Sequence, residues 1–447
     1  MSQLSILIAA WYFPPDGGAG SQRPASFARH LPGLGWDCSV LTRCESANRG
    51  RWDRSDQTLL ARVGDSSKIS RVEQTGPFSE SKFPGERSIK AEIGPFCRRV
   101  IQEVSDTKPD ALLLTMSPFI LSEVLAMMPC ESRTRVVVDL RDPWILDYWT
   151  THSSRRIRRQ QRQLMAEMLE TADGIVMNTP EAKSQCLEMF GDHLDKKMLT
   201  IENGFDVEHP SVATKPDEMK LRIMHTGTFH CESLRRPSSL RSRVGGLRRV
   251  SRGRIDRTGR TPHHLFHAAR ILREEHPKIA DRLHFDFLGD DDSALHDCVA
   301  RGGFGSRTTL HGYVEHDRML DLMTHAGGLF LPGGGLPDDV RDPITPGKTY
   351  EYLASGRPII AALHPGSGRD LVSSCPGVFP CEPCSARSIA DALRALANFV
   401  DGRDIHDLTE DRRAIIAPYH RQALAGRLSE FMKRMIQSEV DGSGPDQ

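Results

Sequence analysis

The chain has 447 residues, too many for one hydrophobic core, so we expect two domains of about 200 residues each. Its 59 Lys and Arg residues balance its 59 Asp and Glu residues, so no global electrostatic field favours nucleic acid as a partner. The 10 cysteines are scattered along the chain, and no apolar run is long enough for a membrane helix, so we expect a cytoplasmic protein.

Short apolar strands alternate with helices in the first half, which predicts a parallel sheet covered by helices. We expect strands at 4–10, 38–42, 111–116, 135–140, 174–178 and 197–203. We expect helices at 23–34, 89–104, 119–128, 155–172 and 180–190. The polar stretch 45–90 is predicted to be a long irregular excursion.

A second alternation follows a polar, proline-containing linker at 206–220. Its strands are expected at 221–227, 283–289, 308–314, 327–332, 358–363 and 377–380, and its helices at 264–275, 317–324, 348–354 and 388–399. A last helix is expected within 406–436, before a disordered tail at 437–447. The fold class predicted is α/β: two Rossmann-like, doubly wound domains, at 1–205 and 221–405, facing a ligand-binding cleft.

The segment 343–363 carries the clearest functional pattern. Gly347 gives a turn, Lys348 begins a short helix, and Gly356 ends it. A helix start with free backbone N–H groups and a lysine suits phosphate, and Glu351 one turn later can bind the two hydroxyls of a ribose. We therefore assign Gly347, Lys348 and Glu351 to a nucleotide diphosphate; a solvated lysine and a buried capping glutamate are the structural alternatives.

Two strand-to-helix turns contain glycines that would let a ligand approach the backbone. Gly17 and Gly18 follow the first strand of the first half, and Gly227 and Thr228 follow the first strand of the second. We expect all four to lie beside the nucleotide diphosphate, although the first loop can also be a tight turn. The spacing is not G-x-G-x-x-G, so no dinucleotide fingerprint is present.

Three charged residues, Asp139, Arg141 and Asp142, follow an apolar strand, and charge at such a position is costly unless it is paired or used. Arg141 can bind a phosphate or a substrate carboxylate, while Asp139 or Asp142 positions a substrate hydroxyl. These three residues are our catalytic candidates. An internal Asp–Arg pair is the alternative, and both interpretations can hold.

Two basic segments and one cysteine pair leave alternatives open. The arginine-rich stretch 231–260 has no lysine and no period, which fits a basic insertion over a diphosphate or a replacement caused by a shifted reading frame. The run at 155–162 fits either an anionic membrane surface or a solvated helix face. Cys381 and Cys384 form a lone C-x-x-C, which predicts free thiols rather than a metal site.

Several motifs occur in a fixed order: YFPPDGGAGSQRPASFARHLPGLGWDCSVLT, VVVDLRDPW, ADGIVMNTPEAK, LTIENGFD, IMHTGTF and PGKTYEYLASGRPII. The ordered set resembles GT-B glycosyltransferases of family 4 (group 1), of the type that acts in polysaccharide biosynthesis. The resemblance implies a retaining hexosyl- or N-acetylhexosaminyltransferase that needs no metal or other cofactor. Its partners would be a nucleotide-diphosphate sugar and a glycan or lipid-linked acceptor, with possible peripheral contact with the inner membrane surface.

The resemblance also assigns roles to residues. Glu351 matches the second of the family's two glutamates, which binds the donor ribose, whereas Pro343 stands at the first, beside Asp342. The turn at Gly227 would lie under the donor diphosphate, but the arginine and lysine usual after it are not identified. A catalytically degenerate GT-B binding protein and a nucleotide-sugar epimerase are therefore the alternative functions.

Overall fold

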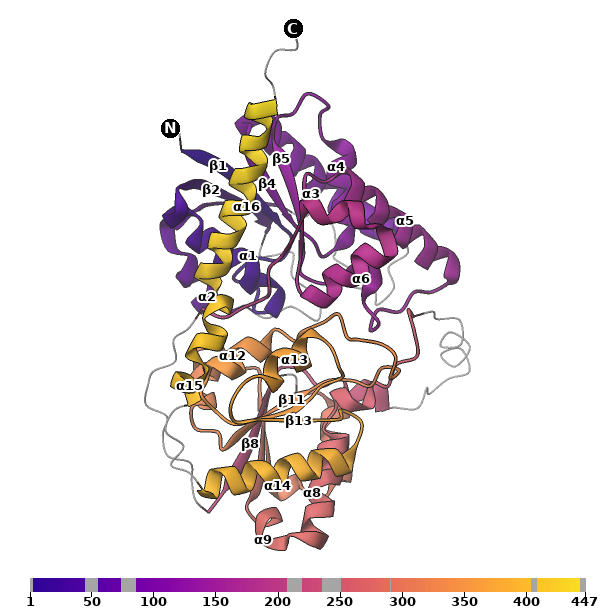
Figure 1. Cartoon of the computed structure of the whole chain (residues 1–447), viewed down its shortest axis with the longest axis vertical. Coiled ribbons are helices and arrows are strands. Elements are labelled where there is room, and N and C mark those ends of the chain that lie inside the picture. Colours follow the sequence, from indigo (N-terminus) through magenta and orange to yellow (C-terminus); the bar gives the residue numbers. More distant parts are fainter. Residues whose placement is uncertain are drawn as a thin grey trace. The chain divides into compact units, whose positions relative to one another are not determined.

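The computed structural model describes residues 3–44, 55–73, 86–206, 219–234, 251–289, 291–402 and 408–442. The chain divides into two compact units (Figure 1). The first combines Met1–Asp206 with Tyr419–Gln447, and the second is Val207–Pro418. The C-terminal segment therefore belongs to the first unit.

A parallel sheet organises the first unit, with strand order β3-β2-β1-β4-β5-β6-β7. Its strands are β1 (Leu4–Ala10), β2 (Trp36–Arg43), β3 (Lys68–Val72), β4 (Ala111–Thr115), β5 (Arg135–Leu140), β6 (Gly174–Met177) and β7 (Met198–Thr200). Its helices are α1 (Ala19–His30), α2 (Gln57–Val63), α3 (Glu86–Thr107), α4 (Glu123–Met127), α5 (Arg155–Thr171), α6 (Pro180–Phe190) and α16 (Arg421–Gly442).

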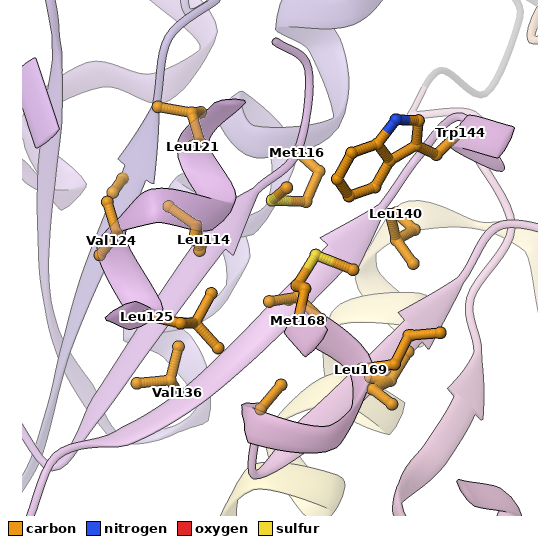
Figure 2. Close-up of a cluster of buried hydrophobic side chains, with 14 of the residues drawn as sticks. Leu114, Met116, Leu121, Val124, Leu125, Val136, Leu140, Trp144, Met168 and Leu169 are labelled. Carbon is orange, nitrogen blue, oxygen red and sulfur yellow. The ribbon is translucent and has the colours of Figure 1, made fainter. Parts of the chain in front are cut away.

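Alternating strand residues divide the core of this unit between the two faces of the sheet. Leu7 and Ala9 of β1 face the cluster completed by α3, α4, α5 and α6. Ile6 and Ile8 face the opposite cluster, completed by α1 and α16. Figure 2 shows part of the first cluster, where side chains of β4 and β5 meet helical side chains, among them Val124, Leu125, Met168 and Leu169.

The second unit repeats this plan in a sheet of order β10-β9-β8-β11-β12-β13, again parallel. Its strands are β8 (Leu221–Thr226), β9 (Leu283–Leu288), β10 (Thr308–Gly312), β11 (Gly328–Pro332), β12 (Ile359–Ala362) and β13 (Val378–Cys381). Its helices are α8 (His263–Glu275), α9 (Pro277–Ala280), α10 (Ser293–Gly302), α11 (His316–Met323), α12 (Lys348–Ala354), α13 (Ser367–Ser373), α14 (Ala386–Gly402) and α15 (Leu408–Ile416). The predicted pair of doubly wound α/β domains is confirmed.

Several predicted elements differ from the structure. The stretch 45–90 is not wholly irregular, because it contains α2 and β3. β3 is an edge strand whose sequence, KISRV, is mostly polar, so it lacks the apolar run of the inner strands. The strand predicted at 197–203 is shorter, since β7 is an edge strand of three residues.

The single last helix predicted within 406–436 is instead two helices, α15 and α16. A 3₁₀ turn at Ala417–Tyr419 separates them, and Pro418 cannot supply the N–H that a continuous helix requires. The second helix runs to Gly442, into the tail predicted to be disordered. The linker residues 207–218, the insertion residues 235–250 and the tail residues 443–447 lie outside the described part of the chain.

Across the described ranges, no helix combines the length and the apolar character that crossing a bilayer demands.

Candidate functional site

The strand order of the second unit reverses between β8 and β11, and ligands of doubly wound sheets bind beyond the carboxyl ends of strands at such a point. Gly227 follows β8 here, is exposed, and has a φ of 102°. A Cβ on Gly227 would lie 2.7 Å from Lys348 Nζ and would displace this ammonium group, while the positive φ itself favours glycine. Thr228, the next residue, is partly buried.

Lys348, the first residue of α12, reaches the end of β8. Its Nζ donates to the carbonyl oxygen of Thr226 and to Nε2 of His225, the latter at 3.3 Å. Nδ1 of His225 lies 3.0 Å from the carbonyl oxygen of Phe330. Because a carbonyl oxygen only accepts, Nδ1 carries the proton and Nε2 is the acceptor. Burial and the charge of Lys348 hold the pKa of His225 well below its usual value, so the imidazole is neutral.

The charge of Lys348 is poorly compensated. Burial, followed by the positive charge of Arg260, lowers the pKa of Lys348 to about 7, against an opposing effect of Glu351. Arg260 ends the 3₁₀ helix η8 (Thr258–Arg260), and its carbonyl oxygen accepts a hydrogen bond from His230 N–H. Two cations near one exposed glycine turn make a site that favours an anion.

Arg260 was not identified from the sequence, where the whole arginine-rich stretch gave no reason to select one arginine. It lies immediately before the helix-start sequence TPHH, and its backbone is hydrogen-bonded to His230 in the segment after β8.

Glu351 projects from α12 into a mostly buried position, with its side chain 12% exposed. Its Oε1 lies 2.7 Å from Nε2 of His316, at the start of α11. This contact fixes the orientation of the carboxylate. The pairing of His316 with Glu351 was not predicted from the sequence, because the contact joins residues on two helices that are distant in the chain.

The rest of α12 is anchored to the same strand end. The Tyr352 hydroxyl accepts a hydrogen bond from Thr226 N–H at 2.8 Å, and the tyrosine is fully buried. Gly347 caps the helix, and the position of its missing Cβ is open space. The structure thus brings together Gly227, Lys348 and Gly347, with Glu351 one helical turn further on.

In the first unit, Asp139 is buried in β5 and belongs to an internal ion pair. Its two oxygens accept from Arg23 Nε at 3.0 and 2.9 Å, and Arg23 Nη2 is 2.7 Å from Oδ1. Arg23 Nη1 also donates to the carbonyl oxygens of Ile201 and Glu202. Asp139 is therefore better described by the alternative given in the sequence analysis, an internal Asp–Arg pair, and its partner is Arg23 rather than Arg141.

Arg141 and Asp142 lie beyond the end of β5. The Arg141 guanidinium stacks over Tyr12, 5.4 Å from the ring centroid, and its Nε is 3.6 Å from Asp142 Oδ2. A Cβ on Gly20 would lie 1.8 Å from Arg141 Nη1. The absent side chain of Gly20 therefore gives Arg141 its place at the first turn of α1.

Gly18 caps α1 with φ −87°, a conformation open to any residue, and Gly17 precedes it. Gly20, the second residue of α1, is a glycine whose missing side chain leaves room for Arg141. Within the described residues, no group of three or more His, Cys, Asp or Glu side chains could hold a metal ion.

Comparison with known proteins finds likeness in structure alone, since no protein-family model and no curated protein matches the chain. Sucrose-phosphate synthase from Thermosynechococcus elongatus has 12% sequence identity and a TM-score of 0.66, covering 97% of this chain and 100% of that one. The catalytic domain of starch synthase IV from Arabidopsis thaliana, bound to ADP and acarbose, has 10% identity and a TM-score of 0.61, covering 98% and 100%. A putative UDP-N-acetylglucosamine 2-epimerase from Listeria monocytogenes has 13% identity and a TM-score of 0.54, covering 100% and 99%. At these identities the likeness shows the fold, and that fold is GT-B.

Proposed function

We propose that the protein is a retaining glycosyltransferase that moves a sugar from a nucleotide-diphosphate sugar to a glycan or lipid-linked acceptor. The observation that carries the proposal is the cationic turn formed by Gly227, Lys348 and Arg260 at the switch point of the second sheet. Such a turn matches the charge of a diphosphate. The GT-B fold, found in sucrose-phosphate synthase and in starch synthase bound to ADP, supports this assignment.

In this reaction the leaving group is a nucleoside diphosphate, so catalysis consists mainly of stabilising the charge that develops on it. Lys348 and Arg260 supply positive charge, and the backbone at Gly227 permits close approach. Glu351, oriented by His316, accepts hydrogen bonds from the ribose hydroxyls. The acceptor hydroxyl attacks the face from which the diphosphate departs, which gives retention.

We assign acceptor binding to residues of the first unit. Asp139 is committed to Arg23, so Asp142, whose side chain is 56% exposed, is the carboxylate left to position an acceptor hydroxyl. Arg141 Nε is buried and has no hydrogen-bond partner in the described structure, which suits an anionic group on the acceptor. Exposed Arg155, Arg156 and Arg159 on α5 support peripheral contact with an anionic membrane surface.

A donor screen by mass spectrometry tests the proposal. The full chain is incubated with a panel of nucleotide-sugars, first without and then with candidate acceptors. Release of nucleoside diphosphate together with a glycosylated acceptor is the expected result. Isomerisation of the donor with no acceptor present would identify an epimerase instead. If calorimetry detects no binding of any nucleoside diphosphate, the protein is a degenerate GT-B binding protein.

Glu351→Gln is expected to weaken nucleoside diphosphate binding by about 10- to 100-fold, because the amide offers one acceptor where the carboxylate offers two. His316→Ala should weaken binding by about 10-fold by releasing the carboxylate. Calorimetry with a ribonucleoside diphosphate and with its 2′,3′-dideoxy analogue tests whether Glu351 binds the ribose hydroxyls. The dideoxy ligand should bind wild type and Glu351→Gln alike; if it discriminates as strongly as the ribose form, Glu351 does not bind the ribose.

We expect transfer activity to survive a chelator, because the proposed positive charge comes from Lys348 and Arg260. Initial rates are measured after dialysis against EDTA and again after Mg²⁺ or Mn²⁺ is restored. Unchanged rates agree with side-chain cations alone. A loss of rate on chelation that either metal reverses would show that a metal ion is required.

A further inference from the structure

The described end of the arginine-rich stretch, residues 251–260, docks onto a glycine loop of the same unit. Asp256 and Gly335 form an antiparallel bridge, in which Asp256 N–H donates to the Gly335 carbonyl oxygen at 2.8 Å and Gly335 N–H donates to the Asp256 carbonyl oxygen at 2.9 Å. Gly335 is the last residue of the triple glycine 333–335, which follows β11. Two backbone hydrogen bonds therefore attach the stretch to a loop at the carboxyl end of the second sheet.

Further hydrogen bonds define the turn that leads from Asp256 to Arg260. The Asp256 carboxylate accepts from Thr258 N–H at 2.9 Å and from the Thr258 hydroxyl at 2.6 Å. The Thr261 hydroxyl donates to the Thr258 carbonyl oxygen at 2.6 Å. An aspartate that accepts from the backbone two residues further on is a common way to fix a turn. These bonds hold the turn in one conformation.

Gly259, the middle residue of η8, is buried in this turn and has no room for a side chain. A Cβ at this position would lie 2.5 Å from the Gly333 carbonyl oxygen, 3.0 Å from the Pro383 carbonyl oxygen and 3.0 Å from Cys384 Sγ. Two of these three atoms belong to the backbone, which cannot rotate away as a flexible side chain can. The Gly333 carbonyl is itself held, because Gly333 N–H donates to the carbonyl oxygen of Ala362, the last residue of β12, at 2.6 Å.

The next residue, Arg260, is held on its other side by the segment after β8, where His230 N–H donates to its carbonyl oxygen at 3.0 Å. Its charge acts on two buried groups of the nucleotide site. Burial is the main cause of the low pKa values of Lys348 and His225, and the positive charge of Arg260 lowers both further. One peptide bond thus links the docked Gly259 to a cation of this site.

We propose that Gly259 is a positioning residue for the nucleotide site: it lets the turn seat against Gly333, and this seating places the Arg260 guanidinium beside the bound diphosphate. The inference rests on the proposed function, since Arg260 acts there as a cation of that site. Gly259 does not have a positive φ, so the reason for glycine is space rather than backbone conformation. A side chain at this position pushes the turn away from Gly333 and carries Arg260 with it.

The first measurement follows Lys348 in the ligand-free protein, so it does not depend on nucleotide binding. NMR titration of isotope-labelled lysine side chains gives the pKa, and Lys348→Met assigns the signal. Arg260→Gln removes a positive charge and should raise the pKa of Lys348 from about 7. Gly259→Ala should raise this pKa as well, and the double variant should show no further rise. Glu351, whose charge opposes the effect of Arg260, is present in all of these variants.

The second measurement is titration calorimetry with a panel of nucleoside diphosphates. Arg260→Gln and Gly259→Ala should each weaken binding by about 10-fold. In the Arg260→Gln background Gly259→Ala should weaken binding no further, because it acts through that arginine. Gly305→Ala is the matched control, since Gly305 lies in the 3₁₀ helix η9 (Gly305–Arg307) of the same unit and a Cβ there meets no atom within 4 Å. This control should leave both the pKa of Lys348 and the affinity unchanged.

Circular dichroism and thermal unfolding show whether Gly259→Ala folds. If it does not, Gly335→Ala takes its place, because a Cβ on Gly335 meets only side-chain atoms, the nearest at 3.1 Å, and it should produce the same two changes at smaller size. The inference is overturned if the variant leaves the pKa of Lys348 at its wild-type value, or if it weakens diphosphate binding equally with and without Arg260. Failure of the wild-type protein to bind any nucleoside diphosphate would contradict the proposed function instead, and the pKa measurement would still decide whether Gly259 positions Arg260.

Discussion

Replacing Lys348 by methionine is expected to weaken nucleoside diphosphate binding by about 100-fold or more, the largest effect we expect from any single change at this site. Methionine keeps much of the length and apolar character of the side chain but removes the ammonium group that lies over Gly227. Titration calorimetry with a panel of nucleoside diphosphates measures the loss. Lys278→Met, at an exposed position on α9 of the same unit, is the matched control. Equal affinity of Lys348→Met and wild type would remove Lys348 from the site.

The same lysine predicts how binding depends on pH. Its pKa is about 7 in the free protein, so above pH 7 a bound diphosphate must recruit a proton to Lys348. Affinity should fall by up to about 10-fold per pH unit above pH 7, until the pKa of the lysine in the complex is reached. Calorimetry in two buffers with different ionisation enthalpies detects this proton uptake, and Lys348→Met should abolish it.

As pH rises above 7, the stability of the folded protein is expected to change in the direction opposite to ligand affinity. Between pH 7 and the ordinary lysine value of 10.5, the unfolded chain holds a proton at position 348 that the folded chain has released. Stability of the ligand-free protein therefore gains a contribution from Lys348 as pH rises through this window. Comparing wild type with Lys348→Met across pH 7 to 10.5 isolates that contribution, because methionine does not titrate.

Asp139→Ala is expected to destabilise the first unit by about 3–5 kcal/mol, because it leaves the buried guanidinium of Arg23 without its partner. All 5 tryptophans precede residue 150, so tryptophan fluorescence during urea denaturation reports on the first unit specifically. Asp142→Ala, at the neighbouring exposed carboxylate, should change stability by only about 0.5 kcal/mol.

A double variant separates the effect of losing the Arg23–Asp139 ion pair from the effect of losing side-chain volume. Arg23→Met combined with Asp139→Leu removes both buried charges and should recover most of the stability lost in Asp139→Ala. A double-mutant cycle of Arg23→Met and Asp139→Leu gives the coupling energy between the two residues, which measures the ion pair directly. A loss below about 1 kcal/mol in Asp139→Ala would show that Arg23 finds compensation elsewhere, and the pair would not be the reason that Asp139 is buried.

Inner strands could be predicted because both of their faces are buried, so their sequences are apolar runs such as RVVVDL in β5. β3 lies at the edge, where one side is solvated, and only Ile69 and Val72 of its five residues are apolar. The bounds of α12 were predicted correctly from Gly347, Gly356 and Pro358, because glycine and proline act on the local backbone.

The partners within the site could not be predicted from the same sequence. A charged residue in an apolar strand, such as Asp139, signals that a partner exists, but it does not say which residue that is. Arg23 and Asp139 are 116 residues apart, and Lys348 and His225 are 123 apart. Contacts of this kind follow from the tertiary fold, whereas spacing in sequence reports only the neighbours along one helix or strand.

The return of α16 to the first unit has a consequence for biosynthesis. The chain leaves this unit after Asp206 and re-enters it at Tyr419, so the second unit is an uninterrupted segment and the first is not. Ile6, Ile8 and Val137 lie on the sheet face that Leu424 and Leu428 of α16 complete. During translation these residues are synthesised early, but they cannot complete their packing until α16 has been made. By then the second unit has already been synthesised in full. The unit made first is therefore completed last, and part of the apolar face of its sheet stays uncovered until α16 has been synthesised.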